Sequence, residues 1–167
     1  MIRKRDPDPL RQFENWLDEA LAAGEALPEA MALATASPDG VPSVRMVLFK
    51  GLSTAGLEFF TNYSSRKCIE MDANPHAAVV FWWEKLRRQV RLEGIVEKLD
   101  AKKSDEYFRT RPRGSQISAW ASRQSQVIAD RKELEELVSD AEVKFRGREV
   151  LRPPFWGGYR LIPSSMT

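Results

Sequence analysis

A tight turn at Pro38-Asp39-Gly40 constrains the fold of this chain more than any other local feature. It lies between two β-rich runs, and a third run follows the loop from Gly51 to Gly56. A proline–aspartate–glycine turn between two such runs predicts a β-hairpin. The first part of the chain is therefore expected to form antiparallel strands that follow one another in sequence.

Two more runs, "HAAVVFWWEKL" and "RRQVRLEGIVEKL", are also predicted to be strands. In the second run Gln89, Arg91 and Glu93 alternate with apolar residues, so one face is apolar and the other is polar. A last strand, "WGGYRLI", is expected at residues 156–162.

Helices are expected around these strands. Residues 8–23 place apolar side chains at helical spacing, with Asp8 as the N-cap and Pro9 at the first helical position. Further helices are predicted at about 66–73, 102–110 and 130–145, with the shorter "SQISAWAS" before the last of them. Antiparallel strands with helices at their ends favour a small β-barrel in an α+β fold. The chain has no βαβ alternation and no GxGxxG motif, which disfavours a Rossmann fold.

The length of 167 residues favours a single domain, 1–167. It would consist of the N-terminal helix, a barrel core at about 30–100, a helical insert at about 102–145 and the final strand. No apolar run approaches the roughly 20 residues that a membrane helix needs, and no hydrophobic segment follows the basic N-terminal residues as in a signal peptide. A single cysteine, Cys68, fits a reducing cytoplasm. We therefore expect a cytoplasmic protein with no membrane association.

The stretch "NYSSRK" places two hydroxyls and two cations where a helix is expected to begin. A helix N-terminus already presents unpaired N–H groups and the positive end of its dipole. Additional cations at Arg66 and Lys67 suggest a bound anion, most simply a phosphate. The alternative is an N-cap serine followed by solvated cations.

Three other polar clusters could belong to the same site. Arg45 and Lys50 lie five apart in an apolar strand, on opposite faces, so one of the two should face a cleft or a partner. Gln89 offers an amide suited to the edge of a heterocycle. The stretch "YFRTRPRGSQISAWASRQSQ" includes Arg111, which precedes Pro112 and so should end a helix; its guanidinium can bind a phosphate through two hydrogen bonds.

Metal and nucleophilic chemistry is disfavoured. His76 is the only histidine and Cys68 the only cysteine, so a zinc site would have to depend on carboxylates. A Ser-His-Asp or Cys-His pair would require His76. A nucleic-acid-binding β-barrel would also use Arg, Lys and aromatic residues. It would not need so many different small polar groups in short turns.

Five segments, "RMVLFK", "FFTNYSSRK", "RRQVRLEG", "YFRTRPRGSQISAWASRQS" and "PPFWGGYRL", closely resemble the pyridoxine/pyridoxamine 5′-phosphate oxidase family in order and spacing. The resemblance runs from about Asp8 to Pro163. It implies an antiparallel, Greek-key-like split β-barrel with peripheral helices that binds FMN and acts as a homodimer, with FMN at the subunit interface.

The resemblance also implies roles for individual residues. The SSRK turn would hold the FMN phosphate, and Gln89, Gln124 and Ser125 would contact FMN partly from the other subunit. Phe60 stands where a tyrosine is often found. The residues implied in FMN binding are Arg45, Met46, Val47, Leu48, Phe49, Lys50, Phe60, Thr61, Arg66, Lys67, Gln89, Gln124 and Ser125. Those implied in binding the phosphorylated substrate are Lys50, Tyr107, Arg111 and Ser115. No catalytic residue and no metal ligand is assigned.

The sequence departs from the family pattern after the last predicted strand. The family continues with a Phe-Trp-Gln-Gly strand and an Arg-Leu-His-Asp-Arg motif, whereas this sequence stops at "LIPSSMT". The expectation is an unpaired sheet edge, weaker FMN binding and slow or absent turnover.

The implied activity is oxidation of pyridoxamine or pyridoxine 5′-phosphate to pyridoxal 5′-phosphate, as in vitamin B6 salvage. A hydride equivalent would pass from C4′ to FMN, with O2 as the electron acceptor. Two alternatives remain: an FMN-binding split-barrel protein with another substrate or impaired activity, and a nucleic-acid-binding β-barrel.

Overall fold

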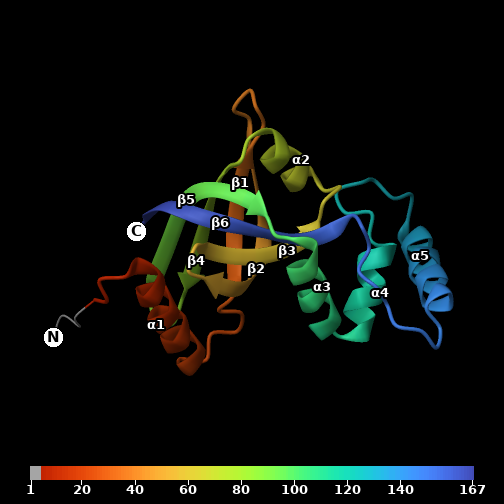
Figure 1. The fold of residues 1–167 in the computed structure, drawn as a ribbon, viewed down its shortest axis with the longest axis horizontal. Coiled ribbons are helices and arrows are strands. Elements are labelled where there is room, and N and C mark those ends of the chain that lie inside the picture. The colour runs from red at the N-terminus through yellow and green to blue at the C-terminus, as the bar shows by residue number, and fades with distance from the viewer. Residues whose placement is uncertain (1–4) are drawn as a thin grey trace.

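The strands of this protein form a closed antiparallel barrel (Figure 1). The computed structural model describes residues 5–167, so the first four residues of the basic N-terminal stretch lie outside it. Within the described part, the strand order around the barrel is β1-β2-β3-β6-β5-β4. The strands are β1 (Ala30–Ala36), β2 (Pro42–Ser53), β3 (Gly56–Asn62), β4 (His76–Trp83), β5 (Arg88–Lys98) and β6 (Trp156–Met166).

The predicted hairpin is confirmed. β1 and β2 pair antiparallel from Ala36–Pro42 to Ala30–Leu48. Gly40 has a φ of 84°, a conformation that glycine adopts without the steric cost of a side chain. Along β1, Met31, Leu33 and Thr35 are buried in alternation, so one face of the hairpin lies against the barrel interior.

The predicted helices are confirmed as well. α1 (Pro9–Ala22) lies across one end, where Phe13 packs on Phe81 with ring centroids 4.9 Å apart. The Asp8 carboxylate accepts the N–H of Leu10 at 2.9 Å, which is the expected N-cap. The remaining helices are α2 (Arg66–Ala73), α3 (Ala101–Thr110), α4 (Arg113–Ala121) and α5 (Arg131–Lys144).

Helices α3, α4 and α5 lie to one side of the barrel (Figure 1). They share a second apolar core that includes Phe108, Ile117, Phe145 and Trp156. Because Trp156 is also the first residue of β6, this second core is joined directly to the barrel wall. Within residues 5–167, no helix is long and apolar enough to cross a membrane.

The last strand corrects one expectation. β6 continues to Met166, beyond the predicted end at residue 162, and it pairs on both sides. Residues 156–161 pair with β3, and residues 159–166 pair with β5 past an irregularity at Glu93/Gly94. The expected unpaired edge is therefore wrong, because β6 bends across the gap between β3 and β5 and closes the barrel.

Gly94 should be essential for that closure. A Cβ at Gly94 would lie 2.0 Å from the carbonyl oxygen of Ile162, a contact that the backbone of β6 would have to relieve by moving. We expect Gly94→Ala to lower the free energy of unfolding by roughly 3 kcal/mol, measured by urea denaturation. Gly114→Ala in α4 is the matched control, since a Cβ there meets nothing within 4 Å. The control should be neutral or gain up to about 1 kcal/mol. Equal stability of the two variants would contradict this account of β6.

Candidate functional site

A cavity of about 860 Å³ lies where β2, β3 and the start of α2 face α3, α4 and the loop that follows α4. Its volume is in the range of small-molecule and cofactor sites. Fourteen of the predicted site residues line it: Arg45, Met46, Val47, Leu48, Lys50, Phe60, Thr61, Arg66, Lys67, Tyr107, Arg111, Ser115, Gln124 and Ser125. Residues from four distant segments of the sequence are thus gathered around one space.

Two predicted residues lie elsewhere. The Phe49 side chain points into the barrel core, with its ring 5.4 Å from that of Phe13, because β2 alternates its side chains between the two faces. Gln89 is exposed on β5 beside Trp82 and does not line the cavity. Contact between Gln89 and FMN stays a prediction, and it would require a second subunit.

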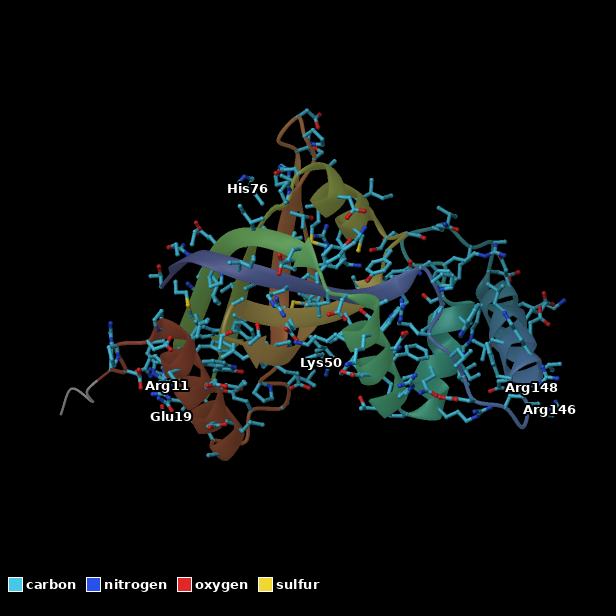
Figure 2. The ribbon with its side chains drawn as sticks, in the orientation of Figure 1. Arg11, Glu19, Lys50, His76, Arg146 and Arg148 are labelled. Atoms are coloured by element: carbon cyan, nitrogen blue, oxygen red, sulfur yellow. The ribbon has the colours of Figure 1, made fainter. Side chains whose placement is uncertain are left out.

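Both Arg45 and Lys50 line the cavity, although they lie five apart in the strand and only one of them was expected from strand alternation to face a cleft or a partner; the family resemblance implied both. The lining includes every residue from Ser43 to Leu48, so the cavity follows the strand and not just one of its faces. In Figure 2, Lys50 lies between the barrel and α3.

Sequence reasoning missed part of the lining, namely Ser43, Val44, Asn62, Thr110, Pro112, Ser118, Ala119, Ser122 and Trp156. Most of these are small or apolar residues without a chemical signature. Ser43 could have been found, since it lies two residues before Arg45 and therefore on the same face of the strand. Asn62 and Trp156 lie inside segments that carry the family resemblance.

Lys67 is a buried cation at one end of the cavity. Its side chain contacts hydroxyl and amide oxygens: Nζ donates to Thr61 Oγ1 at 3.1 Å, Ser65 Oγ at 2.9 Å and Gln124 Oε1 at 2.8 Å. Within residues 5–167 it forms no ion pair with a carboxylate, and the residue is only 5% exposed. Burial lowers the pKa of Lys67 below its ordinary value. An ammonium desolvated in this way requires a countercharge, so the site is suited to an anion.

Ser65 does not cap α2 with its side chain, although the alternative interpretation of "NYSSRK", an N-cap serine followed by solvated cations, assumed such a cap. It precedes the first residue of α2, but its side chain accepts no hydrogen bond from the helix backbone. Its hydroxyl instead accepts a hydrogen bond from Lys67. The backbone N–H groups of Cys68 and Ile69 donate to the Ser65 carbonyl. Within residues 5–167, those of Arg66 and Lys67 therefore stay available to a ligand.

A buried glutamate lies behind the cations. Glu70, which sequence reasoning did not single out, accepts hydrogen bonds from Thr35 and Ser43 at 2.5 Å each, from Arg45 at 3.3 Å and from Arg66 at 2.7 Å. Burial raises the pKa of Glu70. The hydrogen bonds from Ser43, Thr35 and Arg66 outweigh this effect and lower the pKa from 4.5 to about 2.

This lowered pKa predicts a pH dependence of stability. The folded state favours the Glu70 carboxylate, so its contribution should be complete above pH 4.5 and be lost as the pH falls towards 2. Between pH 7 and pH 3 the expected loss is about 2 kcal/mol of the free energy of unfolding, measured by urea denaturation at pH 7, 4.5 and 3. Glu70→Gln should start less stable at pH 7 and lose less over this range. Equal losses in the two proteins would contradict the prediction.

The other end of the cavity holds Arg111. It follows α3, which ends at Thr110 as the following proline predicted, and its guanidinium lies 4.6 Å above the ring of Trp156. Within the described residues, its buried Nη1 has no hydrogen-bond partner. Burial lowers the pKa of Arg111, and Tyr107 opposes that change. A buried N–H donor without an acceptor is costly, so this end is also suited to an anion.

Aromatic rings form the wall beside Arg111. Phe60 is stacked on Tyr107 with ring centroids 3.9 Å apart and lies 5.6 Å from Trp156. Phe60 therefore fills its place through ring stacking, for which the hydroxyl of a tyrosine is not required. No aspartate, glutamate, histidine or cysteine lines the cavity within the part of the chain that the structure describes. The protein thus supplies groups for binding anions, and a bound cofactor would have to supply the reactive chemistry.

Sequence comparisons show which known proteins this chain is similar to. The family model described as "Pyridoxamine 5'-phosphate oxidase" matches residues 17–144. A pyridoxine/pyridoxamine 5′-phosphate oxidase of Rubrobacter xylanophilus is 56% identical over 158 residues, which are 95% of this chain and 73% of that protein. A protein of the same name from Trichormus variabilis is 50% identical over 96% of this chain and 75% of its own length.

Solved structures are similar over nearly the whole chain. PhzG from Burkholderia lata, in complex with tetrahydrophenazine-1-carboxylic acid, has a TM-score of 0.91 at 31% identity and covers 96% of this chain and 80% of its own. An FMN-binding protein of Nostoc punctiforme, described as pyridoxamine 5′-phosphate oxidase-related, has a TM-score of 0.72 at 18% identity, with 98% and 84% covered. The second likeness concerns the fold alone.

Proposed function

This chain belongs to the pyridoxamine 5′-phosphate oxidase family, and from that premise we propose that it uses FMN to oxidise pyridoxamine or pyridoxine 5′-phosphate to pyridoxal 5′-phosphate. Dioxygen would be the electron acceptor, and the reaction would serve vitamin B6 salvage. The observation that carries the proposal is the presence of two cations in one cavity, the buried Lys67 and the half-buried Arg111 with its buried Nη1. Neither has a carboxylate partner among residues 5–167. Two anionic groups, one on the cofactor and one on the substrate, would satisfy both.

The residues at the Lys67 end fit FMN. Arg66 and Lys67 at the start of α2 would hold its phosphate by charge-assisted hydrogen bonds, with Lys67 exchanging one of its three protein acceptors for the phosphate. Arg45 would add its positive charge, because its four Nη–H donors are already used within the protein. The remaining predicted contacts to FMN come from the strand segment Met46–Leu48 and from Thr61, Gln124 and Ser125. FMN, when bound, supplies the two-electron acceptor for the C4′ carbon of the substrate.

The residues at the Arg111 end would bind and orient the substrate. Arg111 would take the substrate phosphate through its free N–H, assisted by Lys50, Tyr107 and Ser115, all of which line the cavity. The stacked rings of Phe60 and Trp156 would exclude water from this side. A phosphate held at a fixed point places the C4′ carbon of the substrate in a defined orientation for reaction.

We also propose a homodimer with FMN at the subunit interface. The outward face of β2 exposes Val44, Met46 and Leu48, at 68%, 64% and 40%, directly at the cavity. Such an apolar strip beside a ligand site is suited to burial against a second copy. Light scattering should give about twice the chain mass of 19.1 kDa, and a monomer mass would contradict the proposal.

A second candidate function is oxidation of a carboxylate-bearing ring compound. It is favoured by the similarity to PhzG, whose structure contains tetrahydrophenazine-1-carboxylic acid. The free N–H of Arg111 can donate a hydrogen bond to a carboxylate as readily as to a phosphate.

The test measures turnover by the FMN-loaded protein, detected as release of peroxide and formation of pyridoxal phosphate. Pyridoxamine and pyridoxine 5′-phosphates should be oxidised, whereas the same compounds without phosphate should react at least about tenfold more slowly in kcat/KM. A preference for carboxylate-bearing ring compounds would support the second candidate. Absence of flavin-dependent turnover with every phosphorylated B6 compound would reject the first.

A further inference from the structure

Glu70 carries a negative charge next to the site that we assign to the FMN phosphate. A carboxylate there repels the ligand, so its presence needs a reason. We propose that Glu70 is a positioning residue, which fixes the guanidinium groups of Arg45 and Arg66 so that the FMN phosphate meets them in a preformed arrangement. The inference depends on the proposed phosphate site and goes beyond it by assigning a role to a residue that does not line the cavity.

The two carboxylate oxygens divide their partners. Oε1 accepts the Nε–H of Arg66 at 2.7 Å. Oε2 accepts hydrogen bonds from the hydroxyls of Thr35 and Ser43 and from Arg45. These partners belong to β1, β2 and α2. Glu70 therefore ties the helix that begins at the phosphate site to the two strands beside it.

The contact with Arg66 has a direct consequence for the ligand. Because Nε is held by Glu70, the guanidinium plane of Arg66 is fixed, and within residues 5–167 its two terminal nitrogens make no hydrogen bond to the protein. Arg66 is otherwise an exposed side chain, 61% accessible, with many possible rotamers. Ordering such a side chain before binding removes an entropy cost from the binding step.

Arg45, on β2, is fixed at the Oε2 atom of Glu70, whereas Arg66 is held at Oε1. It also donates to the carbonyl of Leu33 at 3.1 Å, to Thr35 Oγ1 at 2.6 Å and to the hydroxyl of Ser43. The charges agree with a phosphate ligand: Arg45, Arg66, Lys67 and Glu70 together carry a net +2, and a phosphate monoester carries about −1.5 to −2 at neutral pH.

Glutamine cannot reproduce these contacts. Both arginines donate only, and a glutamine amide offers one acceptor oxygen where the carboxylate offers two. In Glu70→Gln, either Arg66 or the group around Arg45 would face an NH2. The substitution also raises the net charge of the cluster, so charge alone would strengthen phosphate binding while loss of positioning would weaken it. The two roles predict opposite results.

The experiment compares FMN with riboflavin, which lacks the phosphate, by titrating apoprotein and following flavin fluorescence. The wild-type protein should bind FMN much more tightly than riboflavin. Glu70→Gln should reduce that preference by about tenfold or more, equivalent to 1.4 kcal/mol, with riboflavin affinity changed less than about twofold. In an Arg66→Met background, the same substitution should have a smaller effect on the preference.

Glu58→Gln is the matched control. Glu58 is also buried and accepts hydrogen bonds from Lys103 and Arg160, but it does not line the cavity, and neither of these two partners does. It should lose stability and keep the wild-type ratio of FMN to riboflavin affinity.

Each other outcome contradicts a particular statement. Unchanged or tighter FMN binding by Glu70→Gln would show that Glu70 does not position the arginines. An equal loss for both flavins would show a role in the fold only. If the wild-type protein itself did not prefer FMN, the assignment of the phosphate site would be wrong, which is a separate failure from that of Glu70.

Discussion

Lys67→Met should weaken FMN binding by about 10- to 100-fold, the effect of losing one charge-assisted contact of about 1.5–3 kcal/mol. The apoprotein should keep its stability or gain some. Lys67 is desolvated without a carboxylate partner among residues 5–167, which is a cost to folding. Thr61 and Gln124 would still have each other as hydrogen-bond partners, at 3.0 Å. Flavin titration and urea denaturation of the apoprotein measure the two quantities.

Weaker FMN binding together with unchanged or higher apoprotein stability would identify Lys67 as a binding residue. A structural residue would lose stability on substitution. Lys102→Met on the exposed surface of α3 is the control and should alter neither quantity. If Lys67→Met lowered stability and left FMN affinity intact, Lys67 would be part of the fold and the phosphate would have to bind elsewhere.

Arg111→Met should lower kcat/KM for pyridoxamine 5′-phosphate by about 10- to 100-fold or more, mainly through KM, and leave FMN occupancy unchanged. Methionine keeps apolar cover over Trp156 but offers no donor to the substrate phosphate. Arg111→Lys should recover only part of the loss, because an ammonium cannot form the two parallel hydrogen bonds of a guanidinium. Steady-state kinetics and flavin absorbance give both readouts.

Arg109→Met provides the comparison within the same segment. Its guanidinium is exposed, lies 3.8 Å from Glu149 and does not line the cavity, so turnover should be unaffected. Loss of flavin from Arg111→Met would place Arg111 in the cofactor site or in the fold, and the assignment to substrate would be wrong.

Features fixed by a few neighbouring residues could be predicted from the sequence. The Asp8-Pro9 start of α1, the Pro38-Asp39-Gly40 turn and the start of α2 at Arg66 each depend on local backbone preferences, and the structure has all three. The cations at the start of α2 were similarly visible, because a helix terminus and its charges lie within one short stretch.

Features that depend on distant pairing could not be predicted. Glu70 looks like a surface partner of Arg66 four residues earlier, and only the approach of β1 and β2 buries it. The closing pair of β3 and β6 joins Leu57 to Leu161, a register that no local pattern specifies. Alternation along β2 places the Phe49 side chain on the face opposite to those of Leu48 and Lys50. Which of the two faces is the barrel interior depends on the finished barrel.

The pairing of β6 with both β3 and β5 has a consequence for biosynthesis. On the ribosome, β1 to β5 and all the helices of the described chain are made before β6, so the barrel cannot close until this strand has emerged. Until then β3 and β5 each present an open edge to the crowded surroundings of the nascent chain. Closure also brings together residues far apart in sequence, which is a slow step in folding. Trp156 and Tyr159 enter the two cores when β6 docks, and Trp156 then adds its ring to the wall of the cavity.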